Sequence, residues 1–130
     1  MPKVSQLAVS LQSKQGALAR ICSTLGKAGV NISAMLAPEV KGRGKVRLLV
    51  DSPDKAKEAL SAAKIRFSEE EVIGLSLDNR AGALAEIAEK LAHAKINVKY
   101  AYATVAEGSA KGTVIISVPD VEKALGVLGQ

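Results

Sequence analysis

Two stretches of the chain, Gln15-Gly16-Ala17-Leu18-Ala19-Arg20-Ile21 and Ala81-Gly82-Ala83-Leu84-Ala85-Glu86-Ile87, share one pattern of glycine, small and apolar residues. Their glycines are 66 positions apart, since 82 minus 16 is 66. The same offset places Ser52-Pro53-Asp54 on Val118-Pro119-Asp120 without a gap. A constant offset over most of a chain indicates an internal repeat, in which each copy is one supersecondary unit. We therefore expect two similar units of roughly 65 residues each.

The apolar pattern of the two halves predicts the same order of secondary structure. Alternating or continuous apolar runs predict strands over 4–11, 30–37, 46–50, 65–68, 72–77, 97–105 and 113–118. Apolar spacings of three or four predict helices over 17–28, 53–63, 83–94 and 119–128. This βαββαβ order predicts an α+β fold of two ferredoxin-like units in tandem, each with an antiparallel sheet and with both helices on one face.

The expected units are residues 1–68 and residues 69–130. The chain ends before the second unit can form its own last strand, so we expect residues 65–77 to serve both units.

Composition and charge narrow the classes of partner. The net charge of +5 permits a nucleic-acid partner, but the charges are spread along the chain, and its aromatic residues are few: Phe67, Tyr100 and Tyr102. RNA-binding sheets of this shape stack bases on aromatic side chains, so we expect no nucleic-acid partner. We expect no signal segment, and no apolar run approaches the ~20 residues of a membrane span. With the lone Cys22, this predicts a cytoplasmic protein that has no membrane partner.

Residue patterns typical of catalysis are missing from the sequence. No Ser/His/Asp set, carboxylate pair or metal cluster occupies matched positions in the two copies, and His93 is the only histidine. The run Lys41-Gly42-Arg43-Gly44-Lys45 is followed by a predicted strand, whereas a phosphate-binding loop is followed by a helix, so we interpret the run as a hairpin loop. We therefore expect a protein that is not an enzyme and that has no cofactor or metal.

The passages around both glycines resemble the ACT domain signature, which has an acidic residue or Asn, a short turn, Gly-x-Leu opening a helix, and Gly-Ile-Asn-Ile before the next strand. The second copy has Leu77-Asp78-Asn79-Arg80-Ala81-Gly82-Ala83-Leu84 and Lys95-Ile96-Asn97-Val98. The first copy has Ser13-Lys14-Gln15-Gly16-Ala17-Leu18 and Gly29-Val30-Asn31-Ile32. The resemblance covers nearly the whole chain and implies a stand-alone tandem ACT protein.

Four positions depart from the family pattern. Gln15 and Ala81 stand where the family usually has proline, Ser13 replaces the acidic residue, and Lys95 replaces the glycine before the second strand. These departures keep open a scaffold that retains the ACT shape and binds no ligand.

The resemblance implies that an amino acid or a similar small ligand binds at the interface between ACT units, near the glycine loops. The physical chemistry agrees, because the first turn of a helix offers unpaired N–H groups and a positive dipole end to a carboxylate. The expected ligand-binding residues are Ser13, Gln15, Gly16, Ala17, Leu18, Asn31, Asp78, Asn79, Ala81, Gly82, Ala83, Leu84, Asn97, Tyr100 and Tyr102.

The repeated glycines and asparagines also have purely structural interpretations. Gly16 and Gly82 could serve only the turn from strand to helix. Asn31 and Asn97 could satisfy the chain where it leaves a helix, or could hold a ligand through their donors and acceptor.

The remaining polar and aromatic candidates have similar alternatives. Asp78 and Asn79 could cap the helix that follows them. Tyr100 and Tyr102 are two apart on a predicted strand and could be core or subunit-contact residues as well as pocket residues.

These observations predict a non-enzymatic regulatory protein whose ligand changes its association with a partner protein such as a metabolic enzyme. Small units with open sheet edges also favour a homodimer. The alternative is a structural or partner-binding ACT scaffold without a ligand.

Overall fold

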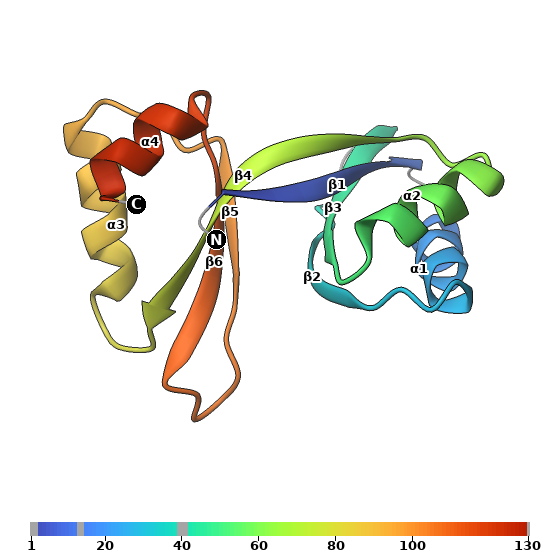
Figure 1. Cartoon of the computed structure of the whole chain (residues 1–130), viewed down its shortest axis with the longest axis horizontal. Helices are drawn as coiled ribbons and strands as arrows, with labels where there is room; N and C mark the ends of the chain where they lie inside the picture. The colour runs from blue at the N-terminus through green and yellow to red at the C-terminus, as the bar shows by residue number, and fades with distance from the viewer. Residues whose placement is uncertain (1–2, 13–14, 39–41, 130) are drawn as a thin grey trace. The chain divides into compact units, whose positions relative to one another are not determined.

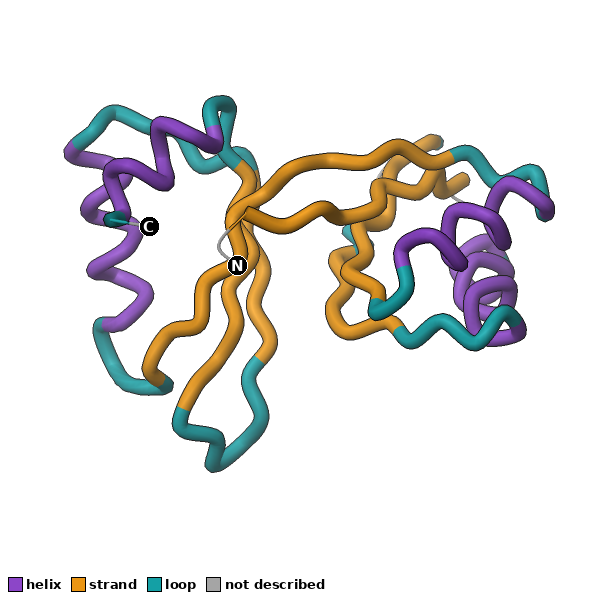
Figure 2. Tube along the Cα trace, in the orientation of Figure 1, coloured by secondary structure: helices purple, strands orange, loops and turns teal. Residues whose placement is uncertain are grey.

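The computed structural model describes residues 3–12, 15–38 and 42–129. Its strands are β1 (Lys3–Gln12), β2 (Ile32–Leu36), β3 (Arg43–Val50), β4 (Phe67–Asp78), β5 (Tyr100–Thr104) and β6 (Lys111–Ser117) (Figure 1). Its helices are α1 (Ala17–Lys27), α2 (Pro53–Ala62), α3 (Ala83–His93) and α4 (Val121–Leu128). Helices and strands follow one another in the same order in the two halves of the chain (Figure 2), which confirms the predicted α+β fold.

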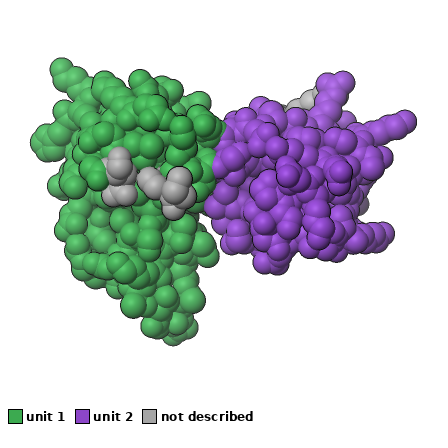
Figure 3. Space-filling view, in the orientation of Figure 1, with its two compact units in different colours: residues 1–4, 71–130 green, residues 5–70 purple. Residues whose placement is uncertain are grey.

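The chain divides into two compact units (Figure 3). We name them after their loop glycines: the Gly16 unit is Ser5–Glu70, and the Gly82 unit is Met1–Val4 together with Glu71–Gln130. The division falls inside β1 and inside β4, so each of these strands contributes residues to both units. On β4 it falls between Glu70 and Glu71.

In the Gly16 unit the strand order is β2-β3-β1 followed by the start of β4. β3 lies between β2 and β1, with Leu48 opposite both Met35 and Leu7 in antiparallel pairings. The side chains of β3 alternate, because Val46 and Leu48 are buried in the core whereas Arg47 between them lies on the opposite face and pairs with Glu70. Helices α1 and α2 lie on one face of these strands (Figure 1). The buried core between them comprises Leu7, Val9, Ile21, Leu25, Val30, Val46, Leu48, Ala56, Leu60 and Ile65.

In the Gly82 unit the order is β4-β6-β5, and α3 and α4 again lie on one face of the strands (Figure 1). The first residues of β1 run beside β4 on its other side: a Cβ added to Gly74 would lie 3.3 Å from the methyl carbons of Val4. The N-terminal end of β1 therefore lies next to β4 in this unit, on the side opposite to β6. The sequence pattern alone did not predict this arrangement.

Both α1 and α3 begin after a glycine in the left-handed conformation. Gly16 has φ 83° and Gly82 has φ 88°, and no side chain caps either helix. Residues with a Cβ rarely adopt this conformation, so glycine is the residue that allows the chain to turn from strand to helix here. The structural interpretation of both glycines is therefore correct, and it leaves room for a second role in binding.

The other ends of the helices share one hydrogen-bond pattern, the Schellman motif, in which a left-handed residue follows the last turn. After α1 this residue is Gly29, with φ 77°. After α2 and α3 it is a lysine, Lys64 and Lys95, each with φ 59°. The N–H of Ile65 donates to the Leu60 carbonyl, and the N–H of Ile96 donates to the Leu91 carbonyl, each at 2.9 Å. A left-handed residue with a Cβ costs about 1 kcal/mol, so both lysines are in a strained conformation.

Two expected loop boundaries are wrong. Residues 43–45 belong to β3 and not to a hairpin loop, because they pair in register with residues 10–12 of β1. Lys41 lies outside the described residues. Asn97 precedes β5 instead of opening it, because β6 ends at Ser117, which is already the partner of Tyr100.

The start of the last helix also differs from the expectation. Pro119 precedes α4 instead of opening it, since the Asp120 side chain accepts a hydrogen bond from the Lys123 N–H at 3.1 Å and caps the helix. A capping carboxylate satisfies one of the unpaired N–H groups at the helix start.

Candidate functional site

An open cavity of about 880 Å³ lies beside Gly16 within the Gly16 unit. It is lined by the end of β1 (residues 10–12), the start of α1 and the turn before it (residues 15–17, 20 and 21), two residues of β3 (44 and 45), and residues 64–66 after α2. Residues 44–45 and 64–66, which are far from the glycine loop in the sequence, thus converge on one side of it.

Three of the sequence-predicted residues line this cavity: Gln15, Gly16 and Ala17. Leu18 does not line it, because its half-buried side chain packs against the core of the unit. Ser13 lies outside the described residues. The backbone N–H groups of the first turn of α1 have no side-chain cap and adjoin the cavity, so they can receive an anionic group.

Cationic side chains surround the cavity. Over the part of the chain that the structure describes, its lining includes the basic residues Arg20, Lys45, Lys64 and Arg66 and no Asp or Glu. Arg20 is held in place because its Nη2 donates to the carbonyl oxygen of Ala63 at 2.7 Å. The arrangement combines an uncapped helix start with four positive side chains, which is an environment that attracts negatively charged groups.

These four cations were not among the ligand-binding residues predicted from the sequence. The signal that could have revealed one of them is the repeat itself, because Arg20 corresponds to Glu86 at the 66-residue offset. Lys45 was assigned to a loop, and neither Lys64 nor Arg66 has a partner in a sequence motif.

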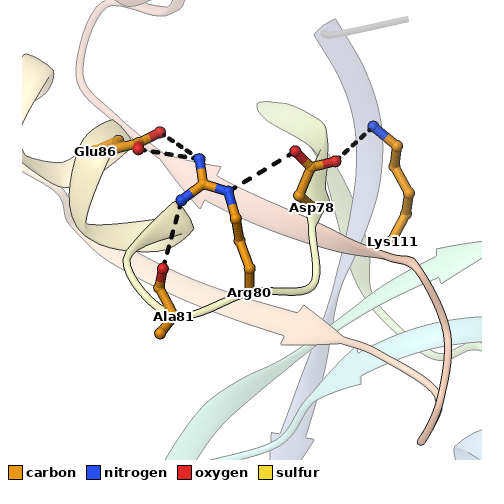
Figure 4. Close-up of polar contacts among 5 residues, drawn as sticks. All are labelled: Asp78, Arg80, Ala81, Glu86 and Lys111. Carbon is orange, nitrogen blue, oxygen red and sulfur yellow. Dashed lines mark hydrogen bonds and ion pairs between the residues drawn. The ribbon is translucent and has the colours of Figure 1, made fainter.

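The equivalent loop of the Gly82 unit carries ion pairs instead (Figure 4). Arg80 Nη2 donates to both carboxylate oxygens of Glu86, at 3.0 and 2.9 Å, and Arg80 Nη1 donates to the carbonyl of Ala81 at 3.4 Å. Asp78 lies on the other side of Arg80, 3.9 Å from its Nε, and 2.9 Å from Lys111 Nζ. The hydrogen bond from Lys111 and its positive charge hold the pKa of Asp78 below its usual value.

Asn79 joins two loops of the Gly82 unit. Its N–H donates to the Ala110 carbonyl and its Nδ2 donates to the Ser109 carbonyl, each at 2.9 Å. Neither Asp78 nor Asn79 caps α3, so the capping interpretation of these two residues is wrong.

Of the other candidates near this loop, Ala81 and Gly82 are exposed, Ala83 is buried and Leu84 is 53% exposed. An exposed leucine side chain of this size at a helix start is available for contact with another molecule.

The asparagines of the two copies lie apart from the cavity lining. The Asn31 N–H donates to the Asp51 carboxylate at 2.9 Å, and the Asp51 N–H donates to the Asn31 carbonyl at 3.0 Å. These two hydrogen bonds connect the segment after α1 to the end of β3. Asn97 is exposed in the segment before β5. Tyr100 and Tyr102 are half-buried on β5, opposite Ser117 and Ile115 of β6.

No group of three or more His, Cys, Asp or Glu side chains within residues 3–12, 15–38 and 42–129 could hold a metal ion. Over the same residues, none of the helices has the length and apolar character needed to cross a membrane.

Comparison with known proteins gives a family match over almost the whole chain. The sequence profile of the ACT domain pair family matches residues 2–129. No curated protein sequence matches the chain.

Solved structures extend this match to the fold. The protein BT0572 from Bacteroides thetaiotaomicron is similar with a TM-score of 0.89 and 29% identity, over 98% of this chain and 87% of that one. The ligand-free regulatory subunit of aspartate kinase from Thermus thermophilus has a TM-score of 0.64 and 18% identity, over 100% of this chain and 97% of that one. Aspartokinase III from E. coli, solved in complex with lysine and aspartate, has a TM-score of 0.58 and 17% identity, over 98% of this chain and 30% of that one.

Proposed function

The chain belongs to the family of paired ACT domains, and from this premise we propose that it is a non-enzymatic regulatory protein that binds an amino acid beside Gly16. ACT domain pairs are typically regulatory domains that bind amino acids. The observation that carries the proposal for this chain is the cavity at the uncapped start of α1.

The residues around the cavity can receive both ends of an amino acid. The N–H groups of the first turn of α1 and the guanidinium of Arg20 are donors for the carboxylate. The side-chain oxygens of Ser10, Gln12 and Gln15 are acceptors for the ammonium group. Because Gly16 has no side chain, the ligand can approach the backbone closely at the point where β1 leads to α1.

Ligand binding would act on the loop that joins β1 to α1 and on the end of α2. Arg20 already connects these elements through its hydrogen bond to Ala63, so a ligand that engages Arg20 would fix α1 relative to the residues after α2. A regulatory effect then requires that the partner protein binds the liganded and ligand-free forms with different affinity. The interface position of the ligand, the homodimer, the partner enzyme and the cytoplasmic location stay predictions from the sequence.

Thermal unfolding in the presence of each common amino acid at millimolar concentration tests the proposal. A ligand at a hundredfold excess over its dissociation constant stabilises the native state by about 2.7 kcal/mol, which raises the unfolding midpoint. We expect one chemical class of amino acid to raise the midpoint. If none does, the amino-acid sensor is contradicted and the ligand-free ACT scaffold becomes the better account.

A further inference from the structure

We infer that the cavity beside Gly16 selects an amino acid with a second carboxylate, that is, a dicarboxylic amino acid, over neutral and basic ones. The inference rests on the proposed function, because it names the class of amino acid that the same site would take. It is carried by the charges around the cavity and by the contrast between the two copies of the repeat.

The lining has a positive charge that a neutral zwitterion cannot offset. Among the described residues of the lining, four side chains are cations and none is an anion. Within the described residues, no ion pair joins Arg20, Lys45, Lys64 or Arg66 to a carboxylate. A ligand with one carboxylate and one ammonium adds no net charge, whereas a second carboxylate brings one negative charge to this positive surface.

Three carboxylates of the Gly16 unit that are near these cations in the sequence have partners elsewhere, and Glu39 lies outside the described residues. Glu69 Oε1 lies 2.7 Å from Lys57 Nζ, and Glu70 Oε1 lies 3.2 Å from Arg47 Nε. The Asp51 carboxylate accepts from the Asn31 N–H. These acids therefore do not neutralise the cavity.

The Gly82 unit provides an internal comparison on the same scaffold. At the 66-residue offset Gln12 corresponds to Asp78, and Arg20 corresponds to Glu86. Lys45 corresponds to another lysine, Lys111. There the two acids pair with Arg80 and Lys111, so the protein itself supplies two carboxylates around the glycine loop. The Gly16 loop has neither carboxylate, has Arg20 in place of Glu86 and retains a lysine at Lys45, so the charge of its cavity is complementary to a ligand that brings two carboxylates of its own.

The two groups of a dicarboxylic amino acid can be received by different parts of the cavity. One carboxylate fits the N–H groups at the start of α1, and the other fits the guanidinium of Arg20, whose Nη2 is already oriented by Ala63. A lysine or arginine ligand would instead place its cationic side chain among the four cationic side chains of the lining. Like charges that lie close together repel one another.

Calorimetric titration of the full chain with aspartate, glutamate, leucine, lysine and succinate tests the inference. We expect aspartate or glutamate to bind about tenfold more tightly than leucine or lysine, and this preference to weaken as salt is raised. Equal affinity for leucine would overturn the inference and leave the proposed function standing. Succinate binding as tightly as aspartate would support the demand for two carboxylates but contradict an amino acid as the ligand. No binding of any amino acid would overturn both.

A matched pair of variants distinguishes the effect of the cavity charge on aspartate binding from the effect of the substitution on folding stability. Lys64→Gly removes a cation from the cavity lining, and Lys95→Gly removes the other left-handed lysine, which lies in the Gly82 unit. Both changes relieve the same backbone strain, so both are expected to raise the unfolding midpoint. Lys64→Gly should weaken aspartate binding about two- to fivefold, as for an exposed charge, while Lys95→Gly should leave it unchanged. Equal affinity in the two variants would overturn the role of the cavity charge.

Discussion

Arg80 and Glu86 form a two-point ion pair at the start of α3, with Arg80 Nη2 at 3.0 and 2.9 Å from the two carboxylate oxygens (Figure 4). The residue that corresponds to Glu86 in the first copy is Arg20, which lines a cavity and contacts no carboxylate in the described part of the chain. The two glycine loops therefore both follow a left-handed glycine but differ in charge: the described residues around Gly16 are cationic, whereas those around Gly82 form ion pairs.

Removing the charge of Glu86 tests how much the ion pair contributes to the fold. Glu86→Gln should lower the free energy of unfolding by less than about 1 kcal/mol, because the side chains of Arg80 and Glu86 are 49% and 61% exposed. Urea unfolding of the variant and the wild type measures this difference. A loss well above this value would mean that the pair is needed to hold the loop before α3.

The left-handed lysine after α3 predicts a stabilising substitution. Lys95→Gly should raise the free energy of unfolding by about 1 kcal/mol, since glycine adopts φ 59° without the clash that a Cβ causes. Thermal unfolding checks the sign. Gly29→Ala is the reverse change at the equivalent position after α1, where φ is 77°, and should destabilise the protein. If both variants shift the midpoint in the same direction, backbone conformation does not control these positions.

Alanine at the loop glycines should destabilise through the backbone alone. A Cβ added to Gly16 would have nothing within 4 Å, so the loss of about 1 kcal/mol expected for Gly16→Ala comes from φ 83° and not from a steric clash. Gly26→Ala is the matched control, because Gly26 is inside α1 and also has open space around it. That control should stabilise the helix by roughly 0.5–1 kcal/mol. Guanidinium unfolding of both variants distinguishes the two effects.

Because the pKa of Asp78 is lowered in the folded protein, part of the loss of folding stability in acid should come from this residue. Because its pKa in the folded state lies below the unfolded value of 3.8, the stability that it contributes is fully present above that pH and is lost as pH falls through the folded pKa. Asp78→Asn, which cannot titrate, should therefore be less stable than the wild type at neutral pH. The difference in stability between the two proteins should be smaller at pH 2.5. Unfolding midpoints across this range measure the effect, and a constant difference at all pH values would contradict it.

The N-cap of the last helix is a simple test of local structure. Asp120→Ala removes the acceptor for the Lys123 N–H and should cost about 1 kcal/mol of stability. Asp120→Asn keeps a capping oxygen and should cost less. Chemical unfolding of the two variants provides the comparison, and equal losses would show that the cap has no stabilising effect.

The fold was predictable because the repeat and the apolar periodicity report on features that the sequence encodes locally. The spacing of Ile21 and Leu25 predicted the buried face of α1, and both are buried in the core. The position of Val4 beside Gly74 was not predictable, because it depends on a pairing of the first residues of β1 with a strand that begins more than sixty residues later.

The candidate site was predictable only in its backbone. Gly16 and its neighbours were found from the repeated motif, since the motif reflects a required backbone conformation. Arg20, Lys64 and Arg66 were missed because they converge on the cavity only after α1 and α2 pack on the same sheet. Charged residues on separate elements carry no sequence signal of their proximity.

The most direct test of amino-acid binding beside Gly16 is a ¹H–¹⁵N NMR titration of the labelled protein with aspartate. We predict that the backbone amide signals of Ala17 and Leu18, at the start of α1, shift in a saturable way, while those of Ala83 and Leu84, at the start of α3, stay in place. Signals of Ala17 and Leu18 that remain unchanged at saturating aspartate and glutamate, or shifts confined to Ala83 and Leu84, would contradict the account.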